Sequence, residues 1–302
     1  MKLSMTVTGD DSTKTVKQLL KGKLHLSERL VKKLKMSGRI LLNSVPVHIN
    51  AKASQGDVLE VLLGSEEQND DIVPENMDLD IIYEDDWLIA INKPPHMVVH
   101  PTFRHFTGTV ANGLKHYLLC KGVKTLIRPV SRLDKDTSGI IVFALDPFIQ
   151  HSLIRQMSSN LYTKEYIGIV HGRFTEPCGK IQLPIERVPG SIMLRHTSPG
   201  GAPSVTHYEV MEQFDAYSLL KFRLETGRTH QIRVHCQAVG HPLLGDTLYG
   251  LPGFEDTHGD LISRQALHSL RTVFNHPVSG LPVVLESSIP DDISNVLEIL
   301  RK

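Results

Sequence analysis

An α+β fold in two domains is the class that the 302-residue sequence predicts, and three observations indicate it. Helical spacing and strand-like alternation both occur, without a regular β-α-β order. The chain is long enough for more than one hydrophobic core. An acidic stretch with a proline, residues 65–78, separates a compact beginning from a longer body. We therefore expect domains at residues 1–64 and 87–302, joined by an acidic linker and approach segment at residues 65–86.

The neutral net charge of the whole chain conceals three segments of different charge. Residues 1–64 carry +6, residues 65–86 carry −10, and residues 87–302 carry +4. The acidic segment is interpreted as a solvated spacer. Because the first domain is basic, the neutral total does not argue against a nucleic-acid partner.

Membrane and secretory proteins are classes that the sequence does not favour. The longest apolar runs, such as residues 140–145, are too short to cross a bilayer, and the first residues lack the apolar stretch of a signal peptide. The cysteines Cys120, Cys178 and Cys236 are scattered and odd in number. We expect a cytoplasmic protein with reduced thiols and no membrane partner.

The first domain is predicted to contain two short helices followed by short strands. Residues 13–24 show helical spacing of leucine and valine, and Ser27 is typical of the N-cap of a second helix over residues 28–36. Gly38 is expected to end that helix. The apolar runs that follow alternate like strands, with a turn at Asn43-Ser44.

Basic helices followed by strands that end in GDVLEV (56–61) resemble the S-four domain, a small RNA-binding module. The resemblance covers residues 12–63, although Asn43-Ser44 stands where the family usually shows Asn-Gly. It implies an RNA-binding surface on the second helix; the alternative is an ordinary solvated lysine-rich helix. The residues implied to bind RNA are Arg29, Lys32, Lys33, Lys35 and Arg39.

The longer body mixes strand and helix patterns. Strands are predicted at WLIAINK (87–93), KEYIGIVHG (164–172) and YSLLKFRLETG (217–227), the last with apolar and charged side chains on opposite faces. Tyr166 lies near the start of the second of these strands. A tyrosine there is usually part of the core, and the alternative is a ring that stacks on a nucleobase.

His96 and His100 stand four residues apart, as a metal-binding pair on a helix would. Pro94, Pro95 and Pro101 disfavour a helix in this segment, and the sequence shows no further set of metal ligands. We therefore expect no metal site. The segment is interpreted as a proline-shaped loop placed to contact a ligand.

A dense group of basic and imidazole side chains lies in residues 225–246, where a strand is followed by a predicted helix. Thr229 is expected to cap this helix, and Arg228 lies at the junction between the two elements. A guanidinium there can bind a carboxylate through two hydrogen bonds and hold it ionised. A structural ion pair is the alternative. Because His230, Arg233 and His235 follow closely, an anion or RNA site is favoured.

The segment SRLDKDTSG (131–139) contains two candidate carboxylates. The chain is expected to be extended up to residue 133 and to turn over residues 134–139 before a strand. Asp136 suits the turn itself, as Asn and Asp commonly do. Asp134 enters the turn from the extended segment and can project from the edge of a sheet, so it is the preferred candidate.

Together these segments resemble the RluA family of pseudouridine synthases. The motifs that carry the resemblance are WLIAINKPPHMVVHP (87–101), SRLDKDTSG (131–139), KEYIGIVHG (164–172), TGRTHQIRVHCQAVGHPLLGDTLYG (226–250) and LHSLRTVFNHPVSG (267–280). They occur in the family order. The first domain resembles that of the RluD-like branch, which acts on the large ribosomal subunit. Ser131 departs from the family, in which His usually precedes Arg-Leu-Asp.

The resemblance implies a central mixed, mainly antiparallel sheet and an isomerase that converts uridines of RNA, most simply ribosomal RNA, without a metal or organic cofactor. It implies catalytic roles for Asp134, for Arg228 as the cation that holds Asp134 ionised, and for Tyr166 against the uracil ring. The implied substrate-binding residues are Arg132, Lys93, His100, Thr137, Lys164 and Arg233.

The role of the aspartate stays open at this point. Asp134 can add to the sugar carbon, remove the 2′ proton of the ribose, or add to the base ring, because each route needs one ionised carboxylate near the bond between sugar and base. A non-catalytic RNA-binding or ribosome-assembly protein on the same fold is the alternative function. It predicts loss of the carboxylate, the tyrosine or the arginine. A metal- or triad-dependent hydrolase predicts ligand clusters or motifs that the sequence lacks.

Overall fold

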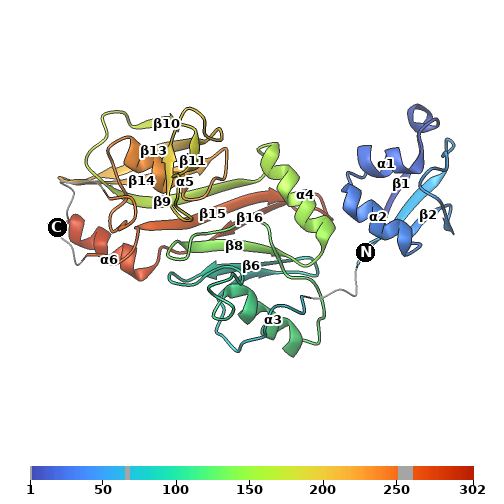
Figure 1. Cartoon of the computed structure of the whole chain (residues 1–302), viewed down its shortest axis with the longest axis horizontal. Coiled ribbons are helices and arrows are strands. Elements are labelled where there is room, and N and C mark those ends of the chain that lie inside the picture. The colour runs from blue at the N-terminus through green and yellow to red at the C-terminus, as the bar shows by residue number, and fades with distance from the viewer. Residues whose placement is uncertain (1, 65–68, 251–260) are drawn as a thin grey trace.

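The computed structural model describes residues 2–64, 69–250 and 261–302. Within them the chain forms a small four-stranded sheet, a large ten-stranded sheet and a separate two-stranded sheet. The small sheet and its helices belong to the first part of the chain, drawn in blue in Figure 1. No helix of the described residues is long and apolar enough to cross a bilayer.

The small sheet is antiparallel, with the order β1-β4-β2-β3. Its strands are β1 (Lys2–Thr6), β2 (Ile40–Leu42), β3 (Val45–Pro46) and β4 (Val58–Leu62). Asn43 and Ser44 join β2 to β3 with positive φ angles of 52° and 64°. Two such residues form the turn that suits a tight hairpin, and Asn is one of the non-glycine residues that adopt this conformation most readily. The expected turn is confirmed, whereas β1 was not predicted.

Two helices pack on this sheet after the short 3₁₀ turn η1 (Gly9–Asp11). Helix α1 (Val16–Gly22) begins at a capping box formed by Thr15 and Gln18. Helix α2 (Glu28–Met36) begins at Ser27, whose hydroxyl accepts a hydrogen bond from the backbone N–H of Leu30 at 3.2 Å. The predicted N-cap of α2 is therefore confirmed.

The large sheet has the order β10-β13-β14-β9-β15-β8-β6-β5, with β16 paired to β15 and β7 paired to β8. Its strands are β5 (Ile81–Glu84), β6 (Leu88–Lys93), β7 (Arg128–Pro129), β8 (Ser138–Ala144), β9 (Thr163–His171), β10 (Cys178–Gln182), β13 (Val205–Gln213), β14 (Tyr217–Leu224), β15 (Leu267–Asn275) and β16 (Pro282–Glu286). Of its pairings, β8 with β15 is parallel and the others are antiparallel. The α+β class and the mixed, mainly antiparallel sheet are confirmed.

Gly139 explains how β8 can run beside β15. Its φ angle is +106°, and a Cβ atom at this position would lie 2.2 Å from the carbonyl oxygen of Ser269. Only glycine allows so close an approach in this conformation. The glycine that ends SRLDKDTSG is therefore needed for the pairing of β8 with β15.

Both faces of the strands β6 and β8 are covered by helices. One face packs against Phe148, Ile149 and Leu153 of α4 (Pro147–Ser158), and the other against α3 (Val110–Cys120). Alternate residues of a strand point to opposite faces, so strands covered on both sides are apolar throughout. This explains the continuous apolar run of β8, all seven residues of which are buried.

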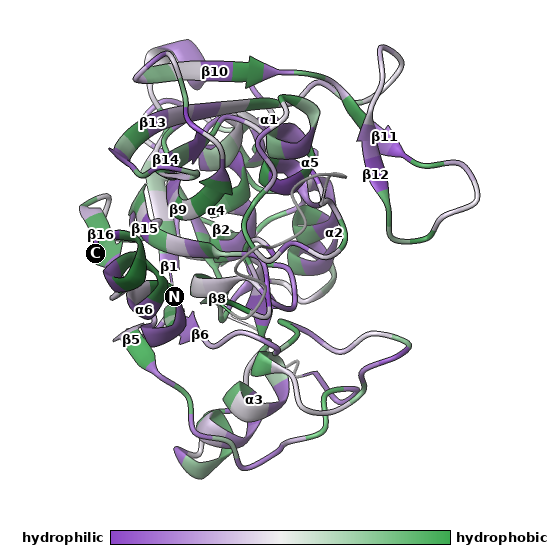
Figure 2. Ribbon diagram, turned by 90° about the vertical axis from the view of Figure 1, so that its left-hand side faces the viewer, coloured by the Kyte–Doolittle hydropathy of each residue, from purple (hydrophilic) through white to green (hydrophobic). Residues whose placement is uncertain are grey.

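Two further helices complete the large domain. Helix α5 (Gln231–Ala238) contributes Ile232 and Cys236 to the same apolar cluster as α3, and helix α6 (Asp291–Leu300) packs on β9 and β14 through Ile293, Val296 and Leu297. The strands β11 (Ile185–Arg187) and β12 (Arg195–Thr197) form a pair that projects away from the large sheet (Figure 2).

The described part of the acidic segment is not a free spacer, which corrects the interpretation of residues 65–78. Ile72 is 2% exposed, and the carbonyl of Val73 accepts a hydrogen bond from the Asn112 side chain of α3 at 2.7 Å. Glu75 Oε2 accepts the backbone N–H of Gly108 at 2.6 Å. Acidic composition predicted solvation, but a few apolar and hydrogen-bonding groups attach this segment to α3. Residues 65–68 lie outside the described residues.

Candidate active site

Asp134 lies where the extended segment after β7 turns into β8. The turn closes through a hydrogen bond from the backbone N–H of Thr137 to the carbonyl of Asp134 at 3.2 Å, as the sequence predicted. The side chain of Asp134 is 25% exposed, so its carboxylate lies at the surface of the domain without being fully hydrated. A group of this kind can meet both a substrate and a buried partner.

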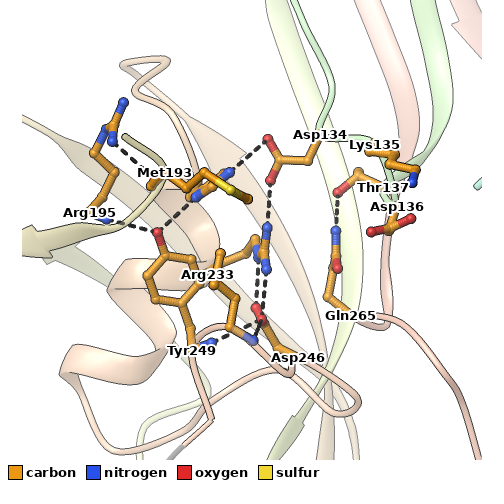
Figure 3. Close-up of polar contacts among 12 residues, drawn as sticks. Asp134, Lys135, Asp136, Thr137, Met193, Arg195, Arg233, Asp246, Tyr249 and Gln265 are labelled. Atoms are coloured by element: carbon orange, nitrogen blue, oxygen red, sulfur yellow. Dashed lines mark hydrogen bonds and ion pairs between the residues drawn. The ribbon is translucent and has the colours of Figure 1, made fainter. Parts of the chain in front are cut away.

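The partner of Asp134 is Arg233, in the first turn of α5 (Figure 3). Arg233 Nη1 donates to Asp134 Oδ2 at 3.2 Å, and the arginine side chain is only 8% exposed. This charge-assisted contact pairs the carboxylate with a buried cation. It also fixes one of the two carboxylate oxygens in space.

Arg233 is itself held by a second carboxylate. Its Nε and Nη2 donate to the two oxygens of Asp246 at 2.7 Å each, and its guanidinium lies 5.0 Å from the centre of the Tyr249 ring. Burial alone would lower the pKa of Arg233, but the hydrogen bonds and charge of Asp246, together with Asp134, outweigh it and raise that pKa. The bidentate pair therefore leaves Arg233 charged and unable to rotate away from Asp134.

His230 completes the surroundings of the carboxylate. Its Nε2 lies 3.8 Å from Asp134 Oδ1, and its Nδ1 is 2.8 Å from the hydroxyl of Tyr249. Burial lowers the pKa of His230, and the carboxylate of Asp134 opposes this only partly, so the imidazole is neutral at neutral pH. Its φ angle of 59° places it in the left-handed region, a strain that is found mostly where function or packing requires it.

The expectation that Arg228 pairs with Asp134 is wrong. Arg228 is exposed, and its Nε donates to the carbonyl of Pro203 at 3.3 Å. The physical reason is the start of α5. The helix is capped by His230 and not by Thr229, so the strand-to-helix junction turns Arg228 outward and brings Arg233 to the inner side.

Tyr166 shares the apolar cluster that supports both halves of the ion pair. It is 4% exposed and belongs to the same cluster as Leu133, which precedes Asp134, and Ile232, which precedes Arg233. The ring is therefore part of the core, as the first interpretation has it. Because this part of the core borders the carboxylate, stacking of the ring on a nucleobase stays a prediction.

Three residues that were expected to bind substrate are buried in structural contacts. Lys93 is 0% exposed, and its Nζ donates to the backbone carbonyls of Pro94, Met97 and Lys135 at 2.8–2.9 Å. Burial lowers its pKa to about 7. Thr137 is 2% exposed and accepts a hydrogen bond from Gln265. Lys93 and Arg233 are therefore bound to groups of the protein and not to a phosphate as they stand, which corrects the expectation of phosphate contacts for these two; the expected substrate contact of Thr137 stays a prediction.

The other expected RNA-contacting residues keep some access to solvent. Arg132 is exposed beside Asp134, and His100 and Lys164 are half-buried. On α2, Arg29, Lys32 and Lys35 are exposed, whereas Lys33 and Arg39 are half-buried. A shallow hollow of α2 is lined by Arg29, Lys32, Lys33, Met36 and Ser37.

Asp246 and Tyr249 are site residues to which the sequence assigned no role, whereas His230 was expected only as part of an anion or RNA site. Asp246 accepts the backbone N–H groups of Leu248 and Tyr249 at 3.1 Å, as an aspartate in a turn often does. The sequence signal was therefore that of a turn. The contact between this carboxylate and Arg233 arises from the tertiary fold and not from a local pattern.

Chemically, the site offers one carboxylate oxygen to a substrate. Asp134 Oδ2 is bound by Arg233, whereas Oδ1 is beyond hydrogen-bond distance of His230. A carboxylate in this position can act as a nucleophile or as a base, and the neighbouring neutral imidazole does not compete with a substrate for its charge.

Comparison of sequences places the chain beside known RNA-modifying proteins. Residues 87–238 match the family described as RNA pseudouridylate synthase, and residues 3–59 match the RluD ribosomal pseudouridine synthase N-terminal domain. The first match includes Asp134, Tyr166, Arg228 and Arg233. The second includes both helices of the first domain.

Two relatives show how far the similarity extends. The protein named Uncharacterized RNA pseudouridine synthase YlyB from Bacillus subtilis is 39% identical over 268 residues, which cover 88% of this chain and 86% of the relative. Ribosomal large subunit pseudouridine synthase D from Neisseria meningitidis serogroup A is 40% identical over 273 residues, which cover 87% and 72%.

Two human structures show the same fold. Human RNA Pseudouridylate Synthase Domain Containing 4 is 23% identical, with a TM-score of 0.59 over 73% of this chain and 92% of that chain. Human RNA Pseudouridylate Synthase Domain Containing 1 is also 23% identical, with a TM-score of 0.56 over 74% and 95%. At this level of identity the likeness concerns the fold.

Proposed function

The chain belongs to the RNA pseudouridylate synthase family and is an RNA pseudouridine synthase, and from that premise we propose that Asp134 is its catalytic carboxylate and that large-subunit ribosomal RNA is its substrate. One observation carries the catalytic assignment. Asp134 is the partly exposed carboxylate that the buried, bidentately held Arg233 contacts.

The reaction exchanges one bond of the ribose for another. The bond between C1′ and uracil N1 breaks, the base turns, and C1′ joins C5; a proton leaves C5, and N1 gains one. Asp134 Oδ1 is the oxygen left open to the substrate. It adds to C1′ as the base departs, removes the 2′ proton, or adds to the base ring, and each route needs one ionised carboxylate, which the contact with Arg233 holds in place.

The uridine must leave its stack to reach this carboxylate, at a cost of a few kcal/mol. Arg132 is exposed and shortly precedes Asp134 in the chain, so it is the side chain we assign to the gap or the backbone beside the flipped nucleotide. Tyr166 lies in the cluster beneath the site, where its ring meets the uracil. Arg228, which does not pair with Asp134, is assigned to the surface that contacts RNA.

Ribosomal RNA is proposed as the substrate because of two similarities, one in the first domain and one over most of the chain. The first domain matches the N-terminal domain of a ribosomal pseudouridine synthase, and relatives named for the large ribosomal subunit are about 40% identical over most of the chain. The exposed cations of α2 supply a grip on phosphates that is tolerant of sequence. Action on ribosomal RNA also supports the expected cytoplasmic location.

The substrate is tested by mapping pseudouridines in a strain that lacks the gene. Ribosomal RNA is treated with a carbodiimide that marks pseudouridine, and stops of reverse transcription are compared with the parent strain. We expect one or more large-subunit positions to lose their mark and to regain it with the wild-type gene but not with Asp134→Asn. Loss confined to transfer RNA would refute the substrate, and full restoration by Asp134→Asn would refute the catalytic role.

A non-catalytic RNA-binding factor is the alternative function. It predicts that the strain without the gene keeps all its pseudouridines while ribosome assembly changes. The same map therefore separates the two functions.

A further inference from the structure

We propose that Arg264 is a positioning residue for the reaction, and that Asp292 at the start of α6 holds it in place. The inference rests on the proposed role of Asp134. Arg264 is 3% exposed and joins α6 to the turn that carries Asp134. Its guanidinium lies between the two elements and contacts both.

Arg264 and its neighbour bind three consecutive residues of the catalytic turn. Arg264 Nη1 donates to the carbonyl of Asp136 at 2.9 Å, and Nη2 donates to the hydroxyl of Ser138 at 3.2 Å. Gln265 Nε2 donates to the hydroxyl of Thr137 between them at 3.1 Å. Figure 3 shows Gln265 reaching Thr137 beside Asp134. The turn is therefore held through its backbone and buried hydroxyls, independently of substrate.

Asp292 fixes the direction of the guanidinium. Its Oδ2 and Oδ1 accept Arg264 Nε at 2.6 Å and Nη2 at 2.9 Å, and Oδ1 also accepts the backbone N–H of Ile293 at 2.8 Å. A planar guanidinium bound at two points cannot turn without breaking both bonds. Nη1 also donates to the carbonyls of Gln265 and Leu267 at 3.3 Å, so Asp292 adds the bidentate contact that holds the guanidinium toward the catalytic turn.

The same segment also touches the other half of the ion pair. Gly245 precedes Asp246, and a Cβ atom on Gly245 would lie 2.3 Å from the carbonyl oxygen of Arg264. The backbone N–H of Ala266 donates to the carbonyl of Leu244 at 2.8 Å. The segment 264–266 therefore lies against both the turn that carries Asp134 and the turn that anchors Arg233 through Asp246.

This arrangement predicts an effect on catalysis that is separate from RNA binding. Displacement of a reacting group by about 1 Å can cost on the order of a hundredfold in rate. The exposed cations that are proposed to bind RNA lie elsewhere and make no contact with Asp292 among the described residues. Loss of Asp292 should therefore lower the rate of the chemical step and leave the dissociation constant for RNA unchanged.

The test uses the full-length protein and an RNA substrate labelled with tritium at uracil C5, since C5 loses its proton in the reaction. Single-turnover rate, dissociation constant and melting temperature are measured for Asp292→Ala and Arg264→Lys. We expect both variants to lose tenfold or more in rate, by displacement of the turn, with the dissociation constant within about twofold of wild type. Asp292→Glu should recover most of the rate, because a carboxylate returns to a site with access to solvent.

Arg301→Ala is the matched control. Arg301 lies just after the other end of α6 and forms an exposed bidentate pair with Glu212, so this variant also removes an ion pair from the same helix. We expect it to keep the wild-type rate. A wild-type rate for Asp292→Ala below its melting temperature, or an equal loss in Arg301→Ala, would overturn the proposal.

Two additions make the outcome decisive. If Asp292→Ala does not fold, Asp292→Asn, which has the same shape without the charge, is judged by the same rate and dissociation constant. If Asp134→Asn keeps tritium release, the proposed function itself fails. If Asp134→Asn abolishes release while Asp292→Ala has no effect on rate, only the positioning role of Arg264 and Asp292 fails.

Discussion

The basic surface of α2 and the ion pairs around Asp134 use the same kinds of side chain in opposite surroundings. On α2, Arg29, Lys32 and Lys35 are exposed and form no ion pair with the described residues. Around Asp134, the guanidinium of Arg233 is 8% exposed and is bound to two carboxylates. Exposed cations are screened by salt and can change direction freely, whereas a buried pair is rigid and costly to break.

The difference separates binding from chemistry. A surface of mobile cations can follow an RNA backbone of many shapes, because each cation can exchange one phosphate for another. A carboxylate that must meet one carbon or one proton of a ribose cannot tolerate such freedom. We therefore expect changes on α2 to act on affinity and changes around Arg233 to act on rate.

Among changes to the cations, the largest effect is expected from Arg233→Lys, which keeps the charge but loses the planar fork that binds Asp246 and Asp134. The rate of tritium release should fall on the order of a hundredfold or more, because the carboxylate is no longer fixed. Arg228→Lys is the matched control. At saturating protein, where a weaker contact with RNA does not limit the reaction, its rate should stay within about twofold, since Arg228 makes no contact with Asp134. Equal losses of rate in the two variants would contradict the proposal that Arg233, and not Arg228, holds Asp134.

A smaller effect is expected from the double change Lys32→Glu and Lys35→Glu on α2. Affinity for RNA should fall about tenfold, and the dependence of log affinity on log salt should become shallower by about 0.7 to 0.9 for each phosphate that the protein no longer neutralises. The single-turnover rate at saturating protein should not change. A reduced rate with unchanged affinity would contradict the role given to α2.

A third effect, on stability and not on rate or affinity, concerns the pH dependence of the support beneath the catalytic turn. His268 is 1% exposed, with Nδ1 at 2.9 Å from the hydroxyl of Ser138 and Nε2 at 3.1 Å from the hydroxyl of Ser287. Burial lowers its pKa to about 4, and the cation of Arg264 adds to this effect. The neutral imidazole is thus the form that the folded protein accepts.

The sign of the pH effect follows from the two states. Below about pH 6.5 the unfolded chain binds a proton on His268 that the folded chain does not bind until about pH 4. The free energy of unfolding therefore decreases as the pH is lowered across this range. Between about pH 7.5 and pH 5 this costs about 2 kcal/mol in the free energy of unfolding. Urea unfolding of His268→Gln should show a pH-dependent loss smaller by that amount. An identical loss in wild type and variant would show that His268 is not responsible.

Patterns local to the sequence predicted much of the molecule. The cap at Ser27 and the turn before β8 depend on a few neighbouring residues. The choice of Asp134 over Asp136 as the catalytic carboxylate rests on equally local reasoning and stays a prediction; Asp136 Oδ1 lies 2.8 Å from His96 Nδ1. Such features need no knowledge of the rest of the fold.

The arginine partner could not be assigned in this way. Whether Arg228 or Arg233 turns inward depends on where α5 begins, and a shift of the cap from Thr229 to His230 decides it. The burial of Lys93 accompanies the pairing of β6 with β8, and the approach of Arg264 to a turn about 130 residues earlier in the chain accompanies the pairing of β8 with β15. Long-range contacts of this kind leave no periodic signal in the sequence.

The central claim is that the ionised Asp134, held by Arg233, performs the reaction, and it is tested most directly by comparing Asp134→Asn with Asp136→Asn. The two carboxylates are two residues apart in the same turn, and both changes replace one oxygen by an amide nitrogen. The measurement is single-turnover tritium release from uracil C5, with RNA affinity measured in parallel. We predict that Asp134→Asn releases no tritium while binding RNA normally, and that Asp136→Asn stays within about tenfold of wild type. Release by Asp134→Asn at the wild-type rate would contradict the account.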